Sequence, residues 1–256
     1  MKSLNLIDVQ EFVNTYIVRF HQDKIQSLGK LKLKTLLRRK NPYLFRAKNI
    51  TLAQDLVQSL LDAHISSSEE ELFGQFLEQL ALFIAGKTCD GVKSSRVGVD
   101  LEFVDNDVYH LVQIKSGPNW GNSTQQKRQE ENFRVAVVDV QTQVESHIII
   151  QPILGICYGR TRTSALRGYF KVVGQNFWYL ISNNEHLYTD IIEPIGYKAR
   201  QHTEEFHRQK ARIINLLVEE IVSDFCDNGL INWEKIVQFN SGNFDFPKFL
   251  NQQPNK

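Results

Sequence analysis

The amino-acid sequence predicts an α/β fold in which helices flank a central mixed β-sheet. Three observations predict it: two β-branched runs enclose a short polar tip, strongly apolar runs follow them as buried strands, and amphipathic helical patterns lie before and after this region. With 256 residues, of which 42% are hydrophobic and 23% charged, the chain is long enough to bury one large core.

No repeat, low-complexity tract or Pro/Gly-rich linker divides the chain, so a single domain over 1–256 is expected. We expect a helical, basic N-terminal region over 1–65, a core over 66–182, a C-terminal helical part over 183–250 and a frayed tail over 251–256.

The cysteines and the apolar segments exclude several classes of protein. Cys89, Cys157 and Cys226 are widely spaced and form no CxxC pair, and the histidines are not clustered, so neither a zinc site nor a disulfide framework is indicated. No segment resembles a signal peptide or a membrane span. We therefore expect a protein of the reducing cytoplasm.

The N-terminal region begins with a helix near Leu6 and continues into a segment of one charge sign. From Lys24 through Gln54 there are nine basic residues and no acid, which leaves 21 of the 30 basic residues against all 29 acids elsewhere. Such a segment offers a surface for phosphate groups, although a solvated helix with an incidental cationic face is the alternative. The candidate contacts are Lys34, Arg38, Arg39 and Lys40.

Two further helices are expected before the first strand. One runs from about Leu52 to His64, and Ser66–Ser68 should cap a longer one that continues through Ala85, with acidic residues in its first turn. The apolar stripe of this longer helix should pack against the sheet; it consists of Leu72, Phe73, Phe76, Leu77, Leu80 and Phe83.

The most informative segment is a hairpin. The runs Val97–Val104 and Val108–Ser116 flank a polar tip, and if Asn106 and Asp107 form the turn, residues whose numbers sum to 213 face each other. Asp100 then lies opposite Gln113. Because side chains alternate along a strand, one face of the hairpin gathers Asp100, Glu102, Gln113 and Lys115.

These residue types suit the hydrolysis of a phosphodiester. Asp100 would anchor a hard cation, Gln113 and the backbone carbonyl of Ile114 would supply further oxygen ligands, and Lys115 would stabilise the negative charge that develops. Mg²⁺ suits so sparse a set, because it keeps several waters and uses only one or two carboxylates; Mn²⁺ should substitute for it. A solvent-facing hairpin with alternating polar residues would give a similar string.

The remaining chain supplies a turn-rich loop and several elements. The loop Gly117–Arg128 follows Lys115 directly and places Asn119, Trp120, Asn122 and Ser123 beside the expected cation. Arg160, Arg162 and Thr163, in the loop Gly159–Thr163, are expected to read bases, although a surface loop that contacts phosphates or nothing is the alternative. The other expected elements are a helix over Lys127–Phe133, strands over Arg134–Val140, Ser146–Gly159 and Asn176–Ser182, and helices over Thr203–Asp227 and Trp233–Phe239.

The arrangement resembles the PD-(D/E)xK nuclease superfamily, with Asp100 as its first motif residue and Gln113-Ile114-Lys115 as its second, and the run IKSGPNWGNS looks like a type II restriction endonuclease. The resemblance implies a restriction-endonuclease-like core. It departs from the usual motif at Gln113, where an acid is normal. This leaves Glu102, or a helical acid such as Glu78 or Glu71, as a candidate to restore the missing charge.

The resemblance implies an Mg²⁺-dependent enzyme that hydrolyses double-stranded DNA at a short specific site, with a DNA methyltransferase in the same system. A homodimer is expected, because two-fold DNA sites are matched most simply by a two-fold protein. The absence of an HNH-like histidine cluster argues against another nuclease class. Two alternatives stay open: a repair, structure-specific or modification-dependent nuclease of the same fold, and a non-catalytic DNA-binding protein.

Overall fold

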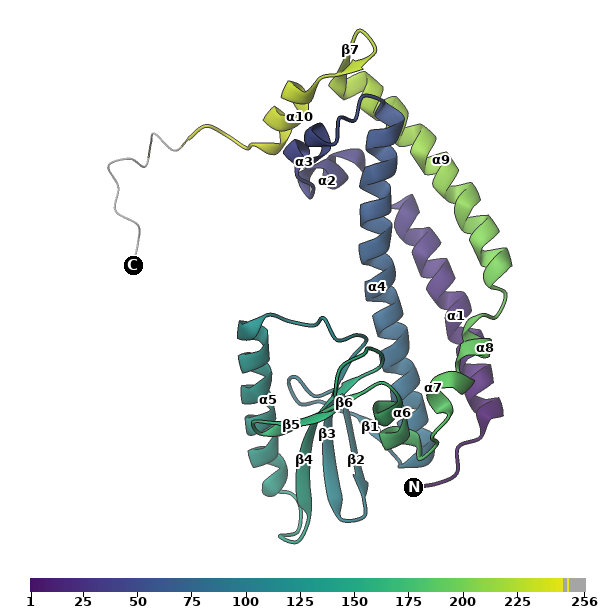
Figure 1. Ribbon diagram of the computed structural model, residues 1–256, viewed down its shortest axis with the longest axis vertical. Coiled ribbons are helices and arrows are strands. Elements are labelled where there is room, and N and C mark those ends of the chain that lie inside the picture. Colours follow the sequence, from purple (N-terminus) through teal and green to yellow (C-terminus); the bar gives the residue numbers. More distant parts are fainter. Residues whose placement is uncertain (246–247, 249–256) are drawn as a thin grey trace. The chain divides into compact units, whose positions relative to one another are not determined.

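Figure 1 shows the computed structural model, which describes residues 1–245 and 248. The expected frayed tail over 251–256 therefore lies outside the described residues. The chain forms two compact units: a sheet unit of Met1–Gln22 and Glu70–Ala199, and a helical unit of Asp23–Glu69 and Arg200–Lys256. Whether the chain folds as one domain stays a prediction. None of the helices in the described part is both long and apolar enough to cross a membrane.

The sheet unit contains a six-stranded mixed sheet in the order β1-β2-β3-β4-β6-β5. Its strands are β1 (Val92–Lys93), β2 (Leu101–Asp105), β3 (Val108–Lys115), β4 (Ile149–Ile156), β5 (Ser164–Leu166) and β6 (Tyr169–Val173). Strands β3, β4 and β6 run parallel, whereas β1, β2 and β5 pair antiparallel to their neighbours. The expected central mixed sheet is confirmed.

The hairpin of β2 and β3 has the expected register. Leu101 pairs with Val112 and Asp105 with Val108, so facing residues sum to 213. Asn106 and Asp107 both have positive φ, 48° and 60°, which a type I′ turn requires and which Asn and Asp tolerate better than most residues. The first strand is shorter than predicted, because regular pairing begins only at Leu101.

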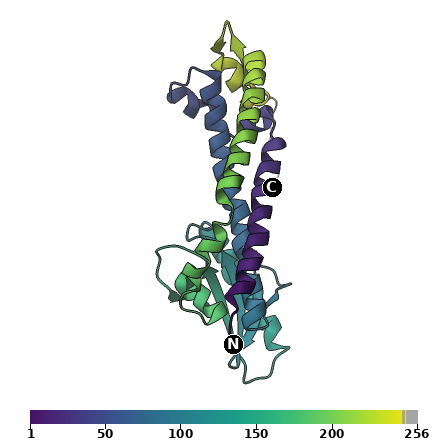
Figure 2. The ribbon, with the colours of Figure 1, turned by 90° about the vertical axis from the view of Figure 1, so that its right-hand side faces the viewer.

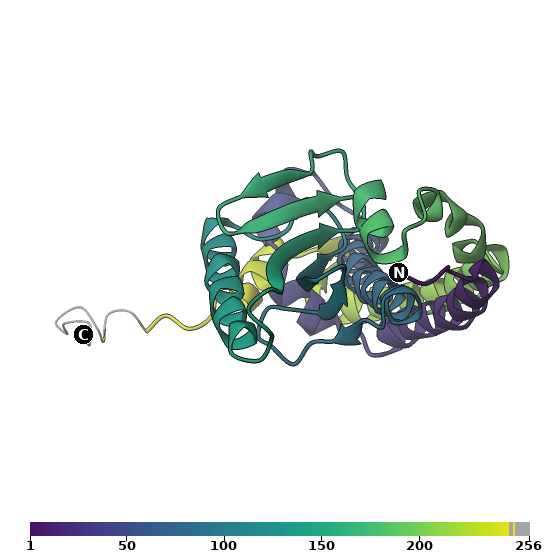
Figure 3. The same cartoon turned by 90° about the horizontal axis from the view of Figure 1, so that it is seen from below.

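Helices cover both faces of the sheet (Figure 3). Phe76, Leu77 and Leu80 of α4 (Ala53–Thr88) pack on one face together with the first part of α1 (Leu6–Gly29) and with α6 (Gln175–Ser182). Phe73 and Phe83 pack against the same cluster while partly exposed, so five of the six residues of the predicted stripe are confirmed, and Leu72 is not part of the cluster. The other face packs against Phe133 and Ala136 of α5 (Ser123–Gln141). The short helices α7 (Leu187–Asp190) and α8 (Ile192–Ile195) follow α6.

The helical unit has its own apolar core. Figure 2 shows α9 (Ala199–Phe225) beside the first half of α4, where Leu217 and Ile221 share a buried cluster with Leu56 and Leu60. The remaining elements are α2 (Leu33–Arg38), α3 (Pro42–Ala47), the strand pair β7 (Cys226–Asp227) and β8 (Leu230–Ile231), and α10 (Trp233–Asn240). The two C-terminal helices were expected and are confirmed.

One predicted helix boundary is wrong. Ser66–Ser68 does not cap a new helix, because α4 continues through it without a break. The Ser67 hydroxyl donates to the Ala63 carbonyl at 3.0 Å, so the helix itself satisfies it. Buried residues on both sides of the serines, among them Leu60 and Phe76, hold the helix in place, and this packing outweighs the local preference of serine for a helix start.

Two predicted strands are helices. Arg134–Val140 belongs to α5, and Asn176–Ser182 lies in α6. The β-branched valines of α5 resemble a strand, yet its buried residues Phe133, Ala136 and Val140 recur at helical spacing. The α6 run is short and apolar, a pattern that does not distinguish a strand from a buried helix. The edge strand β5 and its neighbour β6 were not expected.

The close contact between β4 and α6 gives a test of packing. A Cβ added to Gly155 would lie 2.3 Å from Cε2 of the buried Phe177 ring, so Gly155→Ala should destabilise the protein by about 1–3 kcal/mol. Gly86→Ala in α4 is the control, because its Cβ would meet only the Gly91 carbonyl oxygen at 3.5 Å, and it should gain up to about 1 kcal/mol of helix propensity. Urea unfolding of both variants measures the difference, and equal stabilities would contradict the packing described here.

Candidate active site

Asp100 stands directly before β2, where it joins two strands. Its backbone N–H donates to the Val112 carbonyl at 2.8 Å, and its Oδ2 accepts the backbone N–H of Ile114 at 2.7 Å. The carboxylate is therefore fixed against β3 by a charge-assisted hydrogen bond. This geometry agrees with the expectation that Asp100 faces the Gln113 region of the return strand.

Gln113 and Lys115 lie on the sheet face that α5 covers. They are two and four residues after Leu111 on β3 and therefore share its face, and Leu111 packs against α5. Gln113 is only 8% exposed, and its Oε1 has no hydrogen-bond partner among the described residues. The Lys115 ammonium lies 6.0 Å from the centre of the Trp120 ring. A buried acceptor without a partner needs a physical explanation, and a bound ion or water beside Lys115 would provide one.

The Glu78 carboxylate of α4 interacts electrostatically with Asp100 and Lys115. Burial raises the pKa of its carboxyl, the negative charge of Asp100 raises it further, and the positive charges of Lys93 and Lys115 oppose the shift. The Lys93 ammonium lies 3.9 Å from Glu78 Oε1. Two carboxylates that repel each other form a place where a cation would be favourable. Glu71, the other helical candidate, is exposed two turns earlier on α4.

Glu102 is engaged elsewhere. Its carboxylate, 6% exposed, accepts hydrogen bonds from Ser94, from Tyr109 and from Arg96, which also forms an ion pair with it. Burial raises the pKa of Glu102, but these three donors and the charge of Arg96 outweigh burial and hold the pKa below its ordinary value. Arg96 also donates to Asp139 of α5 at 2.8 Å. Glu102 therefore ties the segment before Asp100 to the sheet and to α5.

With Glu102 excluded, the candidate metal ligands that remain are oxygen atoms, the ligand type that Mg²⁺ and Mn²⁺ prefer. Within the described residues no cluster of three or more His, Cys, Asp or Glu side chains is placed to hold a metal. A cation bound here would be held by the carboxylates of Asp100 and Glu78 together with neutral oxygens, of which Gln113 Oε1, without a partner in the described part of the chain, is one. These residues fit a sparsely ligated divalent ion.

Residues 7–203, more than half of the chain, match the family model described as type II restriction endonuclease EcoO109I. The chain belongs to the EcoO109I family of type II restriction endonucleases. The resemblance to a type II restriction endonuclease is thereby confirmed, and so is the restriction-endonuclease-like fold. No curated protein sequence matches the chain. Family membership makes this EcoO109I-type chain a nuclease that acts on DNA.

In this EcoO109I-family chain the loop after Lys115 leads into α5. Asn122 caps that helix, since its side chain accepts the Gln125 N–H at 3.0 Å while the Gln125 side chain accepts the Asn122 N–H at 2.8 Å. Trp120 packs against the core on this face, whereas Asn119 and Ser123 are exposed. Of the predicted DNA contacts in this loop, Trp120 and Asn122 thus have structural partners of their own.

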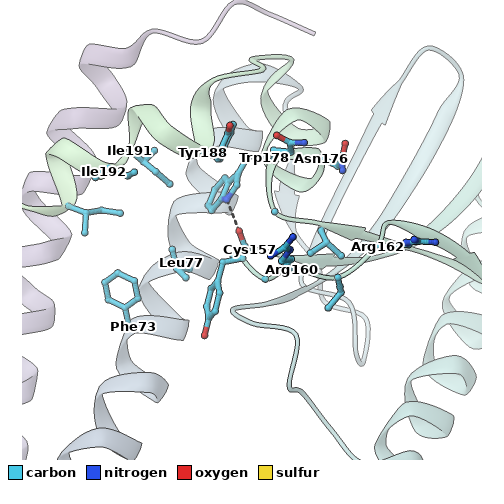
Figure 4. A pocket seen from close by; sticks show the side chains of 17 residues that line it. Phe73, Leu77, Cys157, Arg160, Arg162, Asn176, Trp178, Tyr188, Ile191 and Ile192 are labelled. Atoms are coloured by element: carbon cyan, nitrogen blue, oxygen red, sulfur yellow. Dashed lines mark hydrogen bonds between the residues drawn. The ribbon is translucent and has the colours of Figure 1, made fainter.

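The arginine-rich loop borders a cavity. Cys157 to Thr163 connect β4 to β5, and Arg160 and Arg162 line a cavity of about 840 Å³ at the carboxyl ends of β4 and β6 (Figure 4). Figure 4 shows its apolar wall, which includes Phe73 of α4 and Tyr188 of α7. The Thr163 hydroxyl accepts hydrogen bonds from the Val173 N–H and the Asn176 side chain, both at 3.2 Å.

The predicted basic contacts of the N-terminal region lie in the helical unit. Lys34 and Arg38 are exposed on α2, and Arg39 and Lys40 follow it directly. The Lys34 ammonium lies 3.1 Å from the Asp224 carboxylate, and Arg38 stacks over the Phe239 ring at 5.4 Å. Burial first, and then the charges of Arg39 and Lys40, lower the pKa of the nearby His64.

Sequence reasoning missed one polar surface. A recess of about 290 Å³ beside Lys115 is lined by α5 residues at helical spacing, namely Gln125, Arg128, Gln129 and Asn132. This i, i+3, i+4, i+7 pattern is present in the sequence. It was not recognised because the predicted helix began at Lys127 and ended at Phe133.

The buried pair of Arg96 and Glu102 gives a test of the scaffold. Arg96→Met should destabilise the protein by about 3–5 kcal/mol, because it leaves a buried carboxylate without its cation. Arg134→Met is the control, since it removes an exposed pair with Glu131, and should leave the free energy of unfolding almost unchanged.

The loss of unfolding free energy caused by Arg96→Met should depend on pH. In the wild type the lowered pKa of Glu102 means that the stabilisation is present above the ordinary pKa of Glu and is lost as pH falls through the lowered value. In the variant, burial without Arg96 penalises the ionised form, and this penalty also disappears on acidification. Urea unfolding at about pH 7 and about pH 5 should therefore show the larger deficit at the higher pH; a deficit independent of pH would contradict the ion-pair account.

Proposed function

We propose that this protein is an Mg²⁺-dependent type II site-specific deoxyribonuclease that hydrolyses double-stranded DNA at a short sequence. One observation carries the proposal: the Asp100 carboxylate, the Lys115 ammonium and the Gln113 Oε1, which has no partner among the described residues, lie at adjoining ends of β2 and β3, and the charges of Asp100 and Lys115 act on Glu78. The family assignment supports it, since it places the same chain among restriction endonucleases.

Each residue has a distinct role in the proposed reaction. Asp100, Gln113 and the Ile114 carbonyl would hold the cation, and a divalent ion bound there would supply Lewis-acid chemistry for the attack of water on the phosphate. The hydrogen bond from the Ile114 N–H keeps one oxygen of Asp100 directed at β3 and leaves the other for the ion. Lys115 stabilises the nascent hydroxide and the negative charge on the phosphate by its position beside both.

Glu78 is proposed as the second carboxylate of the centre. Gln113 brings no charge, so without Glu78 the ion would meet only one negative ligand. The raised pKa of Glu78, caused by burial and by Asp100, indicates that the two acids share one small region. Glu102 is less suited to this role, because three donors already occupy its oxygens.

DNA binding is proposed to use three groups of residues. Arg160 and Arg162, which line the cavity after β4, are proposed to contact bases, and Asn119 with Ser123 to contact the strand near the cut. The exposed cations of α2 would bind phosphates. A homodimer in the cytoplasm, with a DNA methyltransferase in the same system, completes the proposal.

The function is tested by incubating unmethylated phage DNA with the protein in Mg²⁺, in Mn²⁺ or in EDTA. The wild type should give discrete bands with the metals only. Asp100→Asn keeps an acceptor for the Ile114 N–H, and Lys115→Met keeps the aliphatic stem beside Trp120, yet each should lower the cleavage rate by about 100-fold or more.

Asp107→Asn is the matched control for this test. It removes an acid from the exposed tip of the same hairpin and should cut like the wild type. Salt-dependent binding of duplex DNA without cutting in either metal would indicate a non-catalytic DNA-binding protein. Cutting that requires methylated DNA or a branched structure would indicate a different nuclease of this fold.

The role of Glu78 predicts a specific rescue. Glu78→Gln alone should lower cleavage by about 100-fold, because it removes one of two negative ligands. Gln113→Glu in the same chain returns a carboxylate to the centre, so the double variant should recover part of the lost rate and should need less Mg²⁺ for half-maximal cleavage than Glu78→Gln. Metal titrations of the cleavage rate measure this, and a double variant no better than Glu78→Gln would remove Glu78 from the centre.

A further inference from the structure

The face of α5 that turns toward the sheet changes character along the helix. In its second half the residues on this face are buried and apolar, as in Phe133, Ala136 and Val140. In its first half the inward positions are polar, since Gln129 is buried and Asn132 half-buried, and the exposed Gln125 and Arg128 lie beside them around the same recess. An amphipathic helix normally keeps its inward stripe apolar, and polar groups in such positions need partners. The first half of α5 therefore lines a surface that is built to be wet or to hold a polar ligand.

That surface is the recess of about 290 Å³ beside Lys115. Its volume corresponds to roughly ten water molecules, so it is larger than a packing defect. Lys115 and Arg128 are cations, and no aspartate or glutamate occurs among the described residues that line it. Gln113, 8% exposed, also lines the recess, and its Oε1 has no partner in the described part of the chain. The recess thus has the charge of an anion site next to the proposed metal centre.

Two contacts hold the recess in place. The buried Gln129 side chain donates to the Gly98 carbonyl at 2.9 Å, and Asn132 lies so close to Gly98 that an added Cβ would be 2.3 Å from its Nδ2. Gly98 has φ +77°, two residues before Asp100. These contacts fix α5 against the segment that carries Asp100. Arg128, in contrast, is exposed and forms no ion pair with the other described residues.

We propose that this recess binds a phosphate of the DNA backbone and that Arg128 donates hydrogen bonds to it. This phosphate would be the neighbour of the phosphate that Lys115 contacts. The proposal rests on the proposed function, because it takes duplex DNA as the substrate. A guanidinium offers a planar pair of N–H donors that matches two phosphate oxygens, and the amides of Gln125 and Asn132 add neutral donors. Arg128 is thus a positioning residue, since it holds the strand in register with the metal centre.

The test compares Arg128→Ala with Lys127→Ala, an exposed cation one residue earlier on the same helix that does not line the recess. Binding of a short duplex is measured in Ca²⁺ over a series of salt concentrations. Arg128→Ala should bind about tenfold more weakly at low salt. The slope of log affinity against log salt concentration should be smaller in magnitude by about 1, the change expected for the loss of one phosphate contact. Arg128→Lys keeps the charge and should restore the slope. Lys127→Ala should match the wild type.

Cleavage by the wild type is measured separately and decides the proposed function on its own. If the wild type cuts DNA but Arg128→Ala and Lys127→Ala have the same salt slope, this inference is wrong while the function stands. Thermal unfolding serves as a further readout. An unchanged midpoint for Arg128→Ala together with the shallower slope supports a DNA contact, whereas a lowered midpoint with an unchanged slope would show that Arg128 is structural.

Discussion

The candidate site depends on the register of one hairpin. Two residues at its tip, Asn106 and Asp107, take a left-handed conformation that closes the turn, and this fixes which residues of β2 and β3 face each other. A shift by one residue would move Gln113 and Lys115 to the opposite face of the sheet and away from α5. In this register the Ile114 N–H can donate to Asp100, and this hydrogen bond holds the carboxylate beside β3. The chemistry of the site therefore follows from a turn at the far end of the strands.

The site keeps polar groups in unfavourable surroundings, and the scaffold around it compensates. Glu78 has a raised pKa because it is buried and lies near Asp100, and Gln113 is buried with an acceptor unpartnered in the described structure. Each of these costs stability without a ligand. The neighbouring buried carboxylate, Glu102, has the opposite environment, with three donors and Arg96 as its counterion. Two acids on adjoining elements thus differ in role, because their partners differ.

The hairpin and its register could be predicted from the sequence because they depend on local chemistry. The turn residues and the alternation of side chains are both visible in about twenty residues. The helices were harder to predict. The valines of α5 and the apolar run of α6 have the composition of strands, and only packing against the sheet shows that they are helical. Ser66–Ser68 resembles a helix start, but burial on both sides continues α4 through it.

The misreading of α5 concealed part of the site. A helix that ends at Phe133 appears as a short surface segment, and Arg128 then looks like one of many solvated cations. When the helix continues to Gln141, its buried residues define an inward face. Gln129 and Asn132 lie on the extension of that face, and Gln125 and Arg128 line the same recess beside them. A polar stripe in line with an apolar one is informative only once the axis of the helix is known. In this protein the boundary of a helix, rather than any motif, thus determines which cation beside Lys115 is a candidate for binding DNA.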